Sequence, residues 1–170
     1  AIEQIPRLIA NIAEQLPIEE DRARARKDEF GAKFAEQTDY INDKAEELFI
    51  LLQCDELRRS STPSLEANKR ITICKERLEK LDSRNRKVEE QAALLEPMMD
   101  KSLNGPKCDI ALLTDIFERK REIWETYDLF FRRYEEWFEG NIKKVSVEKI
   151  EKEVRGFETF CRDVRTRAAE

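Results

Sequence analysis

The feature that most constrains the fold is a stripe of large apolar side chains between residues 110 and 140. Eight of the fourteen aromatic residues of the chain lie there. The stripe advances in alternating steps of three and four residues, which places its members on one face of an α-helix. Its members are Ile110, Leu113, Phe117, Lys120, Trp124, Tyr127, Phe131, Tyr134 and Phe138, with a second row of Ile116, Ile123, Phe130 and Trp137. An apolar face this wide needs cover on more than one side, so we expect other long helices to pack against it.

The stripe has three possible roles. Packing in a core is favoured, and a docking groove for a partner helix is the alternative. A cofactor pocket is not indicated, because no polar groups converge on the stripe.

The first half of the chain predicts three further helices. The first spans about residues 2–15 and ends at Pro17, which cannot donate a helical hydrogen bond. The second runs from about Glu19 to Arg59, and Phe49 and Leu51 broaden its apolar face near the end. Its stripe is Phe30, Phe34, Thr38, Ile41, Ala45, Leu48 and Leu52.

The third helix follows Ser60–Pro63, where Thr62 can cap it and Pro63 can occupy its first position. Its stripe alternates three and four residues over three heptads, as in a coiled-coil seam. Asn85 within this seam either fixes the register of pairing or faces a wet edge of a bundle. The stripe is Ile71, Cys74, Leu78, Leu81, Asn85, Val88, Ala92 and Leu95.

Turn-forming residues separate the remaining helices. Pro97 ends the third helix, and residues 96–108 predict a loop and the main hinge of the chain. Gly140 can stop the aromatic helix, with residues 140–145 as the turn that follows. The last helix is capped by Ser146. Its stripe is Val147, Ile150, Val154, Phe157, Cys161, Val164 and Ala168.

Composition agrees with these patterns. Four glycines and five prolines leave little material for turns, while 41% charged and 40% hydrophobic residues suit long amphipathic helices. We therefore predict an all-α fold, an elongated antiparallel bundle of about four to five long helices. Residues 1–108 form one region and residues 109–170 another. The chain opens in mid-pattern without an initiator Met, so we expect a piece of a longer protein.

The sequence offers little for catalysis, cofactors or membranes. It has no histidine, its four cysteines are widely separated, and its four glycines are isolated, so nucleophile–base pairs with His, zinc motifs and phosphate-binding loops are all missing. We predict no catalytic, cofactor-binding or metal site. A net charge of −5 with interspersed signs does not indicate a nucleic-acid partner. The longest uncharged run has seven residues and no signal peptide opens the chain, so we expect a cytoplasmic protein without a membrane partner.

The last 60 or so residues resemble the start of the linker region of dynein heavy chains, most closely the axonemal kind. Two groups of residues carry the resemblance. The first is Ile123, Trp124, Thr126, Phe130, Tyr134, Glu135, Trp137 and Gly140, and the second is Val145, Glu148, Ile150, Glu151, Glu153 and Val154. The family often has proline directly after the glycine, where this chain has Asn141, so the turn can differ.

This resemblance implies a fragment from the junction of tail and linker in a microtubule motor. The parent chain would be a minus-end-directed ATPase whose ATP and Mg²⁺ sites lie outside these residues, in cilia or flagella. Its partners would include the rest of the heavy chain, with other heavy, intermediate or light chains or a regulatory factor as further candidates. We expect the packing residues to be Trp124, Tyr127, Phe130, Phe131, Tyr134, Trp137 and Phe138, with Gly140 at the turn. The alternative is a coiled-coil or spectrin-like interaction module without a motor.

Overall fold

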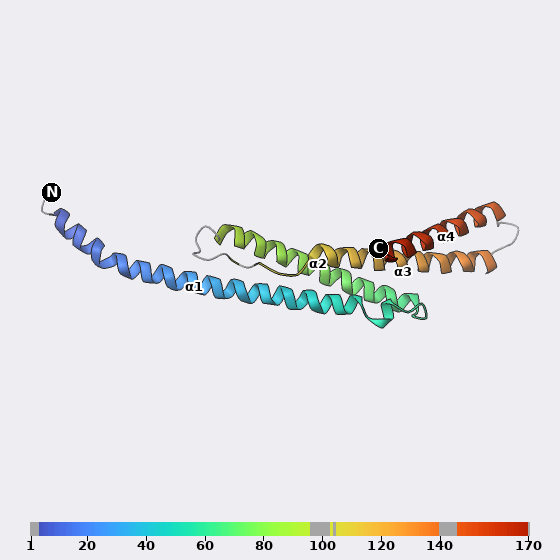
Figure 1. Ribbon diagram of the computed structural model, residues 1–170, viewed down its shortest axis with the longest axis horizontal. Coiled ribbons are helices and arrows are strands. Elements are labelled where there is room, and N and C mark those ends of the chain that lie inside the picture. The colour runs from blue at the N-terminus through green and yellow to red at the C-terminus, as the bar shows by residue number, and fades with distance from the viewer. Residues whose placement is uncertain (1–3, 96–102, 104, 140–145, 170) are drawn as a thin grey trace. The chain divides into compact units, whose positions relative to one another are not determined.

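The computed structural model describes residues 4–95, 103, 105–139 and 146–169. This part of the chain contains α-helices, one short 3-10 helix and no strand, which confirms the prediction of an all-α helical bundle (Figure 1). The elements are α1 (Gln4–Leu52), the 3-10 helix η1 (Asp55–Leu57), α2 (Ser64–Leu95), α3 (Ile110–Glu139) and α4 (Val147–Ala169).

The predicted break at Pro17 is wrong, because α1 continues through it. A proline inside a helix removes one hydrogen bond and its ring crowds the carbonyl four residues earlier, at a cost of about 3 kcal/mol. A bend relieves this clash when nothing packs tightly around it. Residues 9–26 are all exposed, and Figure 1 shows the first turns of α1 at an angle to the remainder. The helices predicted before and after Pro17 are therefore parts of the single helix α1.

The other helix ends differ from the predictions by a few residues. The second predicted helix was expected to reach Arg59, but α1 ends at Leu52 and η1 follows. Phe49, one of the two residues that broaden the predicted apolar face, is 43% exposed. The carbonyl of Pro63 accepts hydrogen bonds from the N–H groups of Glu66 at 3.0 Å and Ala67 at 3.1 Å, so Pro63 rather than Thr62 precedes the first turn of α2.

The chain forms two compact units. Unit 1 comprises Ala1–Phe49 and Arg77–Ile110, and unit 2 comprises Ile50–Glu76 and Ala111–Glu170. The predicted boundary at residue 108 lies near one of the crossings, but residues 50–76 belong with α3 and α4. The predicted hinge is described only at residues 103 and 105–108, and the predicted turn at residues 140–145 lies outside the described residues.

Unit 1 is built on an antiparallel pair of helical segments. The predicted stripes supply its buried side chains, which are Phe34, Thr38, Ile41, Ala45 and Leu48 of α1 and Leu78, Leu81, Asn85 and Val88 of α2. The side-chain oxygen of Asn42 accepts hydrogen bonds from the backbone N–H groups of Lys107 at 2.9 Å and Cys108 at 3.2 Å. These bonds fasten residues 107–108 to α1.

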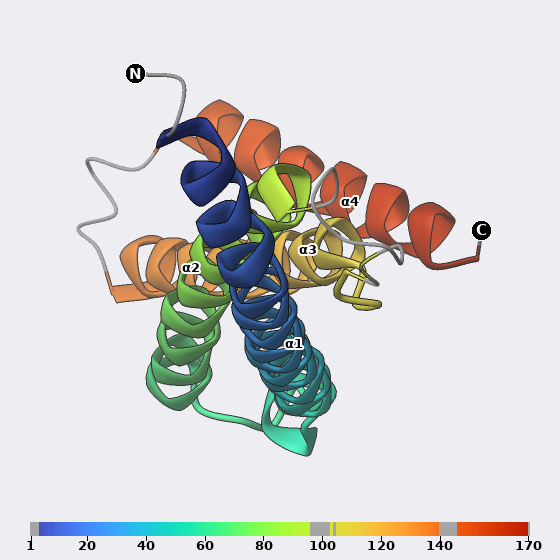
Figure 2. The ribbon, with the colours of Figure 1, turned by 90° about the vertical axis from the view of Figure 1, so that its left-hand side faces the viewer.

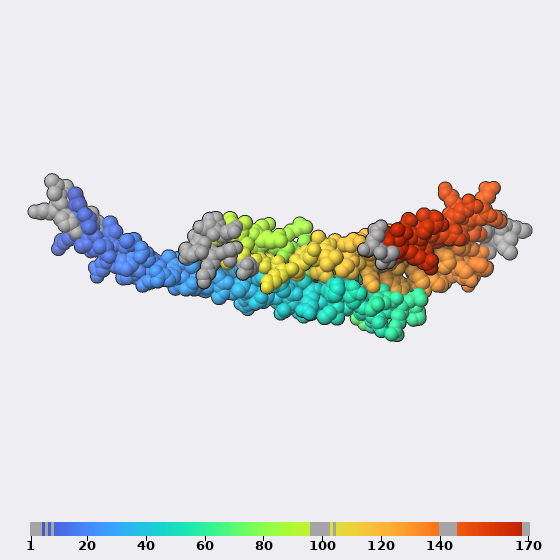
Figure 3. Space-filling model, viewed as in Figure 1, coloured from blue at the N-terminus to red at the C-terminus, as the bar shows by residue number. Residues whose placement is uncertain are grey.

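The first part of α1 has no such cover. Its large apolar residues Ile5, Ile9, Ile12 and Leu16 are each more than half exposed. Figure 3 shows this part of α1, in dark blue, without another segment of unit 1 over it on the visible face. Unit 1 therefore contains a closely packed pair of helical segments and, at the start of α1, a helical segment whose apolar residues are exposed.

Unit 2 contains a helical hairpin packed with residues 50–76. Its buried side chains come from Leu52, Leu57, Ala67, Ile71, Cys74, Leu113, Phe117 and Trp124. Helix α4 returns alongside α3 in antiparallel orientation, since Trp137 near the end of α3 contacts Glu153 early in α4, and Glu122 contacts Arg167 late in α4. Figures 1 and 2 both show this pairing.

Candidate functional site

The first half of the aromatic stripe on α3 lies in the core of unit 2. Leu113, Phe117 and Trp124 are 5%, 2% and 5% exposed. They follow one another at steps of four and seven residues, which brings them to the same side of the helix. Of these three, Trp124 reaches the connection between α1 and α2, where its indole N–H meets the carbonyl of Leu57.

Three side chains of α3 hold residues 57–60 through backbone carbonyl groups. The indole N–H of Trp124 and the ammonium of Lys120 each donate to the carbonyl oxygen of Leu57 at 3.4 Å. The hydroxyl of Tyr127 donates to the carbonyl oxygen of Ser60 at 3.0 Å. Leu57 is the last residue of η1, and carbonyl groups at a helix end lack helical partners, so Trp124 and Lys120 supply donors there.

The charge of Lys120 is costly in this position. Burial lowers the pKa of Lys120, and the positive charge of Arg58 lowers it further. A lysine in an otherwise apolar stripe is explained by its long alkyl chain, which crosses the apolar surface to reach a polar group. The backbone carbonyl of Leu57 is that group.

One further bond ties the start of α2 to α3. The hydroxyl of Ser64 donates to a carboxylate oxygen of Asp128 at 2.9 Å. Together with the bonds to Leu57 and Ser60, it fastens residues 57–64 along α3 from Lys120 to Asp128. We name these contacts the α3 clamp.

The second row of the aromatic helix faces α4. The rings of Phe130 and Phe157 meet edge to face with centroids 5.3 Å apart. The indole N–H of Trp137 donates to a carboxylate oxygen of Glu153 at 3.2 Å, and Arg133 lies 3.9 Å from the same carboxylate. Phe130 and Trp137 were predicted as packing residues, and the structure places both half-buried against α4.

Packing does not extend to the remaining predicted residues at the end of the stripe. Phe131 and Tyr134 are 43% and 44% exposed, and Phe138 is 71% exposed. Phe131 contacts Tyr127, and Tyr134 contacts Phe138, but these rings pack on their own helix. The expectation of a fully packed ridge is wrong here, because α4 covers the row of Phe130 and Trp137 and leaves this face open. Gly140 lies outside the described residues.

A groove of about 710 Å³ lies between α3 and α4. Its walls are mostly apolar and aromatic, and two arginines of α4 lie among the lining residues. It is lined by Ile123, Thr126, Tyr127, Phe130, Phe131, Val154, Phe157, Glu158, Phe160, Cys161, Arg162 and Arg165. We name it the α3–α4 groove. Most of these residues belong to the apolar stripes identified in the sequence. The sequence did not indicate that the stripes of α3 and α4 lie side by side.

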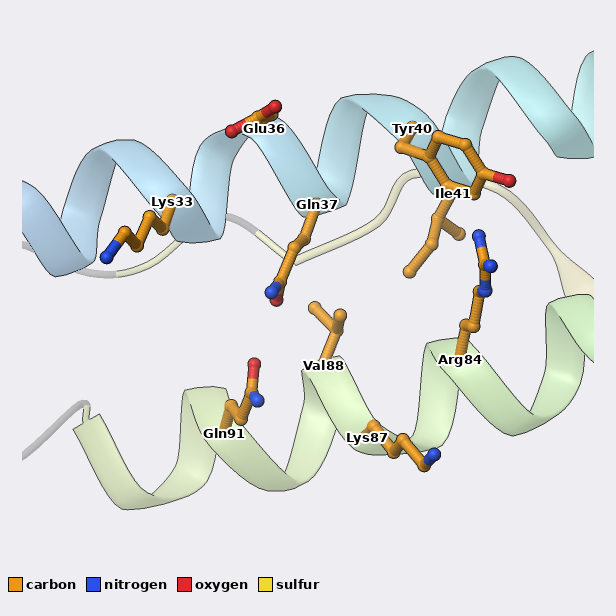
Figure 4. Close-up of a pocket in the computed structure, with 9 residues that line it drawn as sticks. All are labelled: Lys33, Glu36, Gln37, Tyr40, Ile41, Arg84, Lys87, Val88 and Gln91. Carbon is orange, nitrogen blue, oxygen red and sulfur yellow. The ribbon is translucent and has the colours of Figure 1, made fainter.

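Unit 1 has a smaller groove of about 460 Å³ beside its seam (Figure 4). Ile41 and Val88 point toward one another at its base, and the guanidinium of Arg84 lies over the ring of Tyr40 at 4.7 Å. Charges of both signs line it, including Lys33 and Glu36. This mixture resembles an ordinary solvated flank of a helix pair.

Asn85 lies in the seam of unit 1 and is 8% exposed, so it does not face a wet edge. Its amide donates to a carboxylate oxygen of Glu89, one turn later, at 2.8 Å. Its role in setting register stays a prediction. Thr38, on α1, is also buried, and its hydroxyl oxygen has no hydrogen-bond partner among the described residues.

Comparisons with protein-family models, curated proteins and solved structures gave no match.

The described residues contain no group of three or more His, Cys, Asp or Glu side chains that could hold a metal ion. None of their helices has an apolar stretch that could cross a bilayer. The features that remain for function are the α3 clamp, the α3–α4 groove and the bare start of α1.

The sequence did not predict which groups accept the hydrogen bonds of the α3 clamp. The acceptors at Leu57 and Ser60 are backbone carbonyl groups, which leave no mark in a sequence. Lys120 is the one available signal, because a charged residue inside an apolar stripe indicates a polar group within reach.

Proposed function

We propose that this chain is a structural segment of a dynein heavy chain, of the axonemal kind, from the junction between tail and linker. In this proposal the segment is not catalytic. It passes force between the tail and an AAA+ motor whose ATP sites lie elsewhere in the parent chain. Its place is the axoneme of a cilium or flagellum, among other dynein subunits.

The observation that carries the proposal is the position of the residues on which the resemblance rests. Trp124 binds the carbonyl of Leu57, Phe130 packs on Phe157, and Trp137 binds Glu153. These three residues of the resemblance therefore join α3 to its neighbours at separate points along its length.

Such an arrangement suits a part that carries load. A densely packed interior is hardly compressible and transmits strain to its neighbours. A helix fastened at several points along its side passes an applied force to adjacent helices through all of them together. The α3 clamp and the α4 contacts provide such points on two sides of α3.

The alternative is a coiled-coil or spectrin-like interaction module without a motor. The seam of unit 1 favours it, because α1 and α2 bury residues at alternating steps of three and four, including Ile41, Leu48, Leu81 and Val88. The two proposals differ in what the rest of the parent polypeptide does.

Antibodies raised against the chain of residues 1–170 provide the test. They are used to recover the native polypeptide from cell extract, and the recovered material is assayed for microtubule-stimulated ATP hydrolysis and for microtubule gliding. The motor proposal predicts both activities in a much longer polypeptide. A recovered polypeptide that neither hydrolyses ATP nor moves microtubules refutes it and leaves the interaction module.

A further inference from the structure

The α3–α4 groove has the chemistry of a helix-binding site. Phe130 and Phe157, whose rings contact each other, are among its lining residues, and Ile123, which also lines it, is 38% exposed. Grooves of this kind receive the apolar face of an amphipathic helix.

The charged side chains that line the groove indicate which charge its occupant carries, and at which end. Arg162 and Arg165 lie toward the end of α4, both are exposed, and neither guanidinium has an ion-pair partner among the described residues. Glu158 is the one acidic residue lining the groove. The groove therefore carries net positive charge and calls for a helix with carboxylates at one end.

The chain itself contains such a helix at the start of α1. Ile5, Ile9, Ile12 and Leu16 are separated by steps of four, three and four residues and are 53% to 61% exposed. Glu19 and Glu20 follow Leu16 by three and four residues, so they share its face of the helix. Glu19 is paired with the neighbouring Arg22 at 2.5 Å, but exposed pairs of this kind are weak.

The two surfaces also agree in length. From Val154 to Arg165 the groove spans eleven positions of α4, and from Ile9 to Glu20 the stripe spans eleven positions of α1. At about 1.5 Å per residue, each distance is about 16 Å. When the apolar residues fill the groove, the acidic end of the stripe reaches the arginines.

We propose that the α3–α4 groove binds the start of α1 from a second copy of this chain. The contact removes apolar surface of both copies from water, which supplies its main driving force. It joins two different surfaces, so it is a head-to-tail contact rather than a symmetric one. It does not depend on the motor proposal.

The test uses sedimentation velocity of the full chain over a range of concentrations. The groove variant is Ile123→Glu, and the stripe variant is Ile9→Glu combined with Ile12→Glu. Leu129→Glu is the matched control, because Leu129 is on the same helix as Ile123 and similarly exposed, at 42%, but does not line the groove. We expect the wild type and the control to associate, and the groove and stripe variants each to remain monomeric.

Mixing the two monomeric variants gives the decisive result. The groove variant retains an intact stripe and the stripe variant retains an intact groove, so the mixture is expected to form a one-to-one complex. Failure to form it overturns the proposal. A wild type that stays monomeric, or a groove variant that associates as strongly as the wild type, also overturns it, since the latter indicates pairing of α1 with α1.

Charge reversal tests the polarity without touching the apolar floor. Replacing Arg162 and Arg165 by Glu is expected to weaken association about tenfold or more at low ionic strength. Replacing Glu19 and Glu20 by Arg in a second copy should restore it. Both arginines are exposed, so this variant keeps its fold and decides the question even if circular dichroism shows that Ile123→Glu is unfolded. Unchanged affinity on reversal refutes the proposed orientation.

Discussion

Replacing Trp124 by Ala tests whether the aromatic stripe stabilises unit 2. The indole is 5% exposed, its N–H donates to the carbonyl of Leu57, and its ring meets Tyr127 with centroids 5.3 Å apart. Truncating a buried tryptophan costs about 3–5 kcal/mol, from lost burial and the cavity left behind. Since whole domains are stable by only about 5–15 kcal/mol, this loss is easily measured.

Two further variants separate the sources of that loss. Trp124→Phe keeps an aromatic ring but removes the N–H donor, so we expect an intermediate cost of about 1–2 kcal/mol, mainly from the lost hydrogen bond. Phe138→Ala removes an aromatic ring from the same helix, but one that is 71% exposed. It should change the free energy of unfolding by about 0.5 kcal/mol or less.

The assay combines urea unfolding, followed by circular dichroism, with hydrogen exchange of the amides in residues 57–64. Trp124→Ala should lower the unfolding midpoint and accelerate exchange in this segment, because the α3 clamp loses one of its donors. If Trp124→Ala costs no more than Phe138→Ala, or leaves exchange in residues 57–64 unchanged, the reasoning about the clamp is refuted.

Three other variants have definite expected outcomes. Lys120→Met removes a group whose lowered pKa means that its charged form is penalised in the folded state. The wild type should therefore gain stability as pH rises toward the ordinary lysine value of 10.5, and denaturation curves of the variant should lack that gain. Thr38→Val replaces a buried hydroxyl without a partner by a methyl group of the same shape, and a thermal melt should show unit 1 stabilised by about 1 kcal/mol; a lower melting temperature contradicts this. Pro17→Ala restores a helical hydrogen bond to the carbonyl of Ala13 and should slow amide exchange around residue 17, by an amount consistent with up to about 3 kcal/mol; unchanged exchange there contradicts it.

Periodicity predicted most of the fold correctly. The stripes from Phe34 to Leu48 and from Leu78 to Val88 are buried as expected, because helical spacing alone decides which residues share a face. Ser146 precedes α4 as predicted, and its carbonyl accepts the first helical bonds, from Lys149 and Ile150, at 3.1 Å. These features depend on residues close together in the chain.

The structure differs from the predictions where contacts between residues far apart in the chain, or the cooperativity of a long helix, determine the conformation. Pro17 is a strong local signal, but a long helix can absorb one defect by bending. The stripe on α3 indicates which side chains share a face, yet it cannot tell whether another segment covers them, so Trp124 is buried and Phe138 is exposed. The placement of residues 50–76 with α3 depends on tertiary contacts, such as Trp124 to Leu57, that local patterns do not contain.

The position of this chain within its native assembly distinguishes a motor segment from an interaction module. Electron cryo-microscopy of the native particle, labelled with an antibody fragment against the exposed surface of α2, locates helices α1 to α4. We expect them to lie between the tail and an ATP-hydrolysing ring, with Trp124 packed on residues 57–60. A particle without such a ring, or one in which Trp124 lies away from these residues, contradicts it.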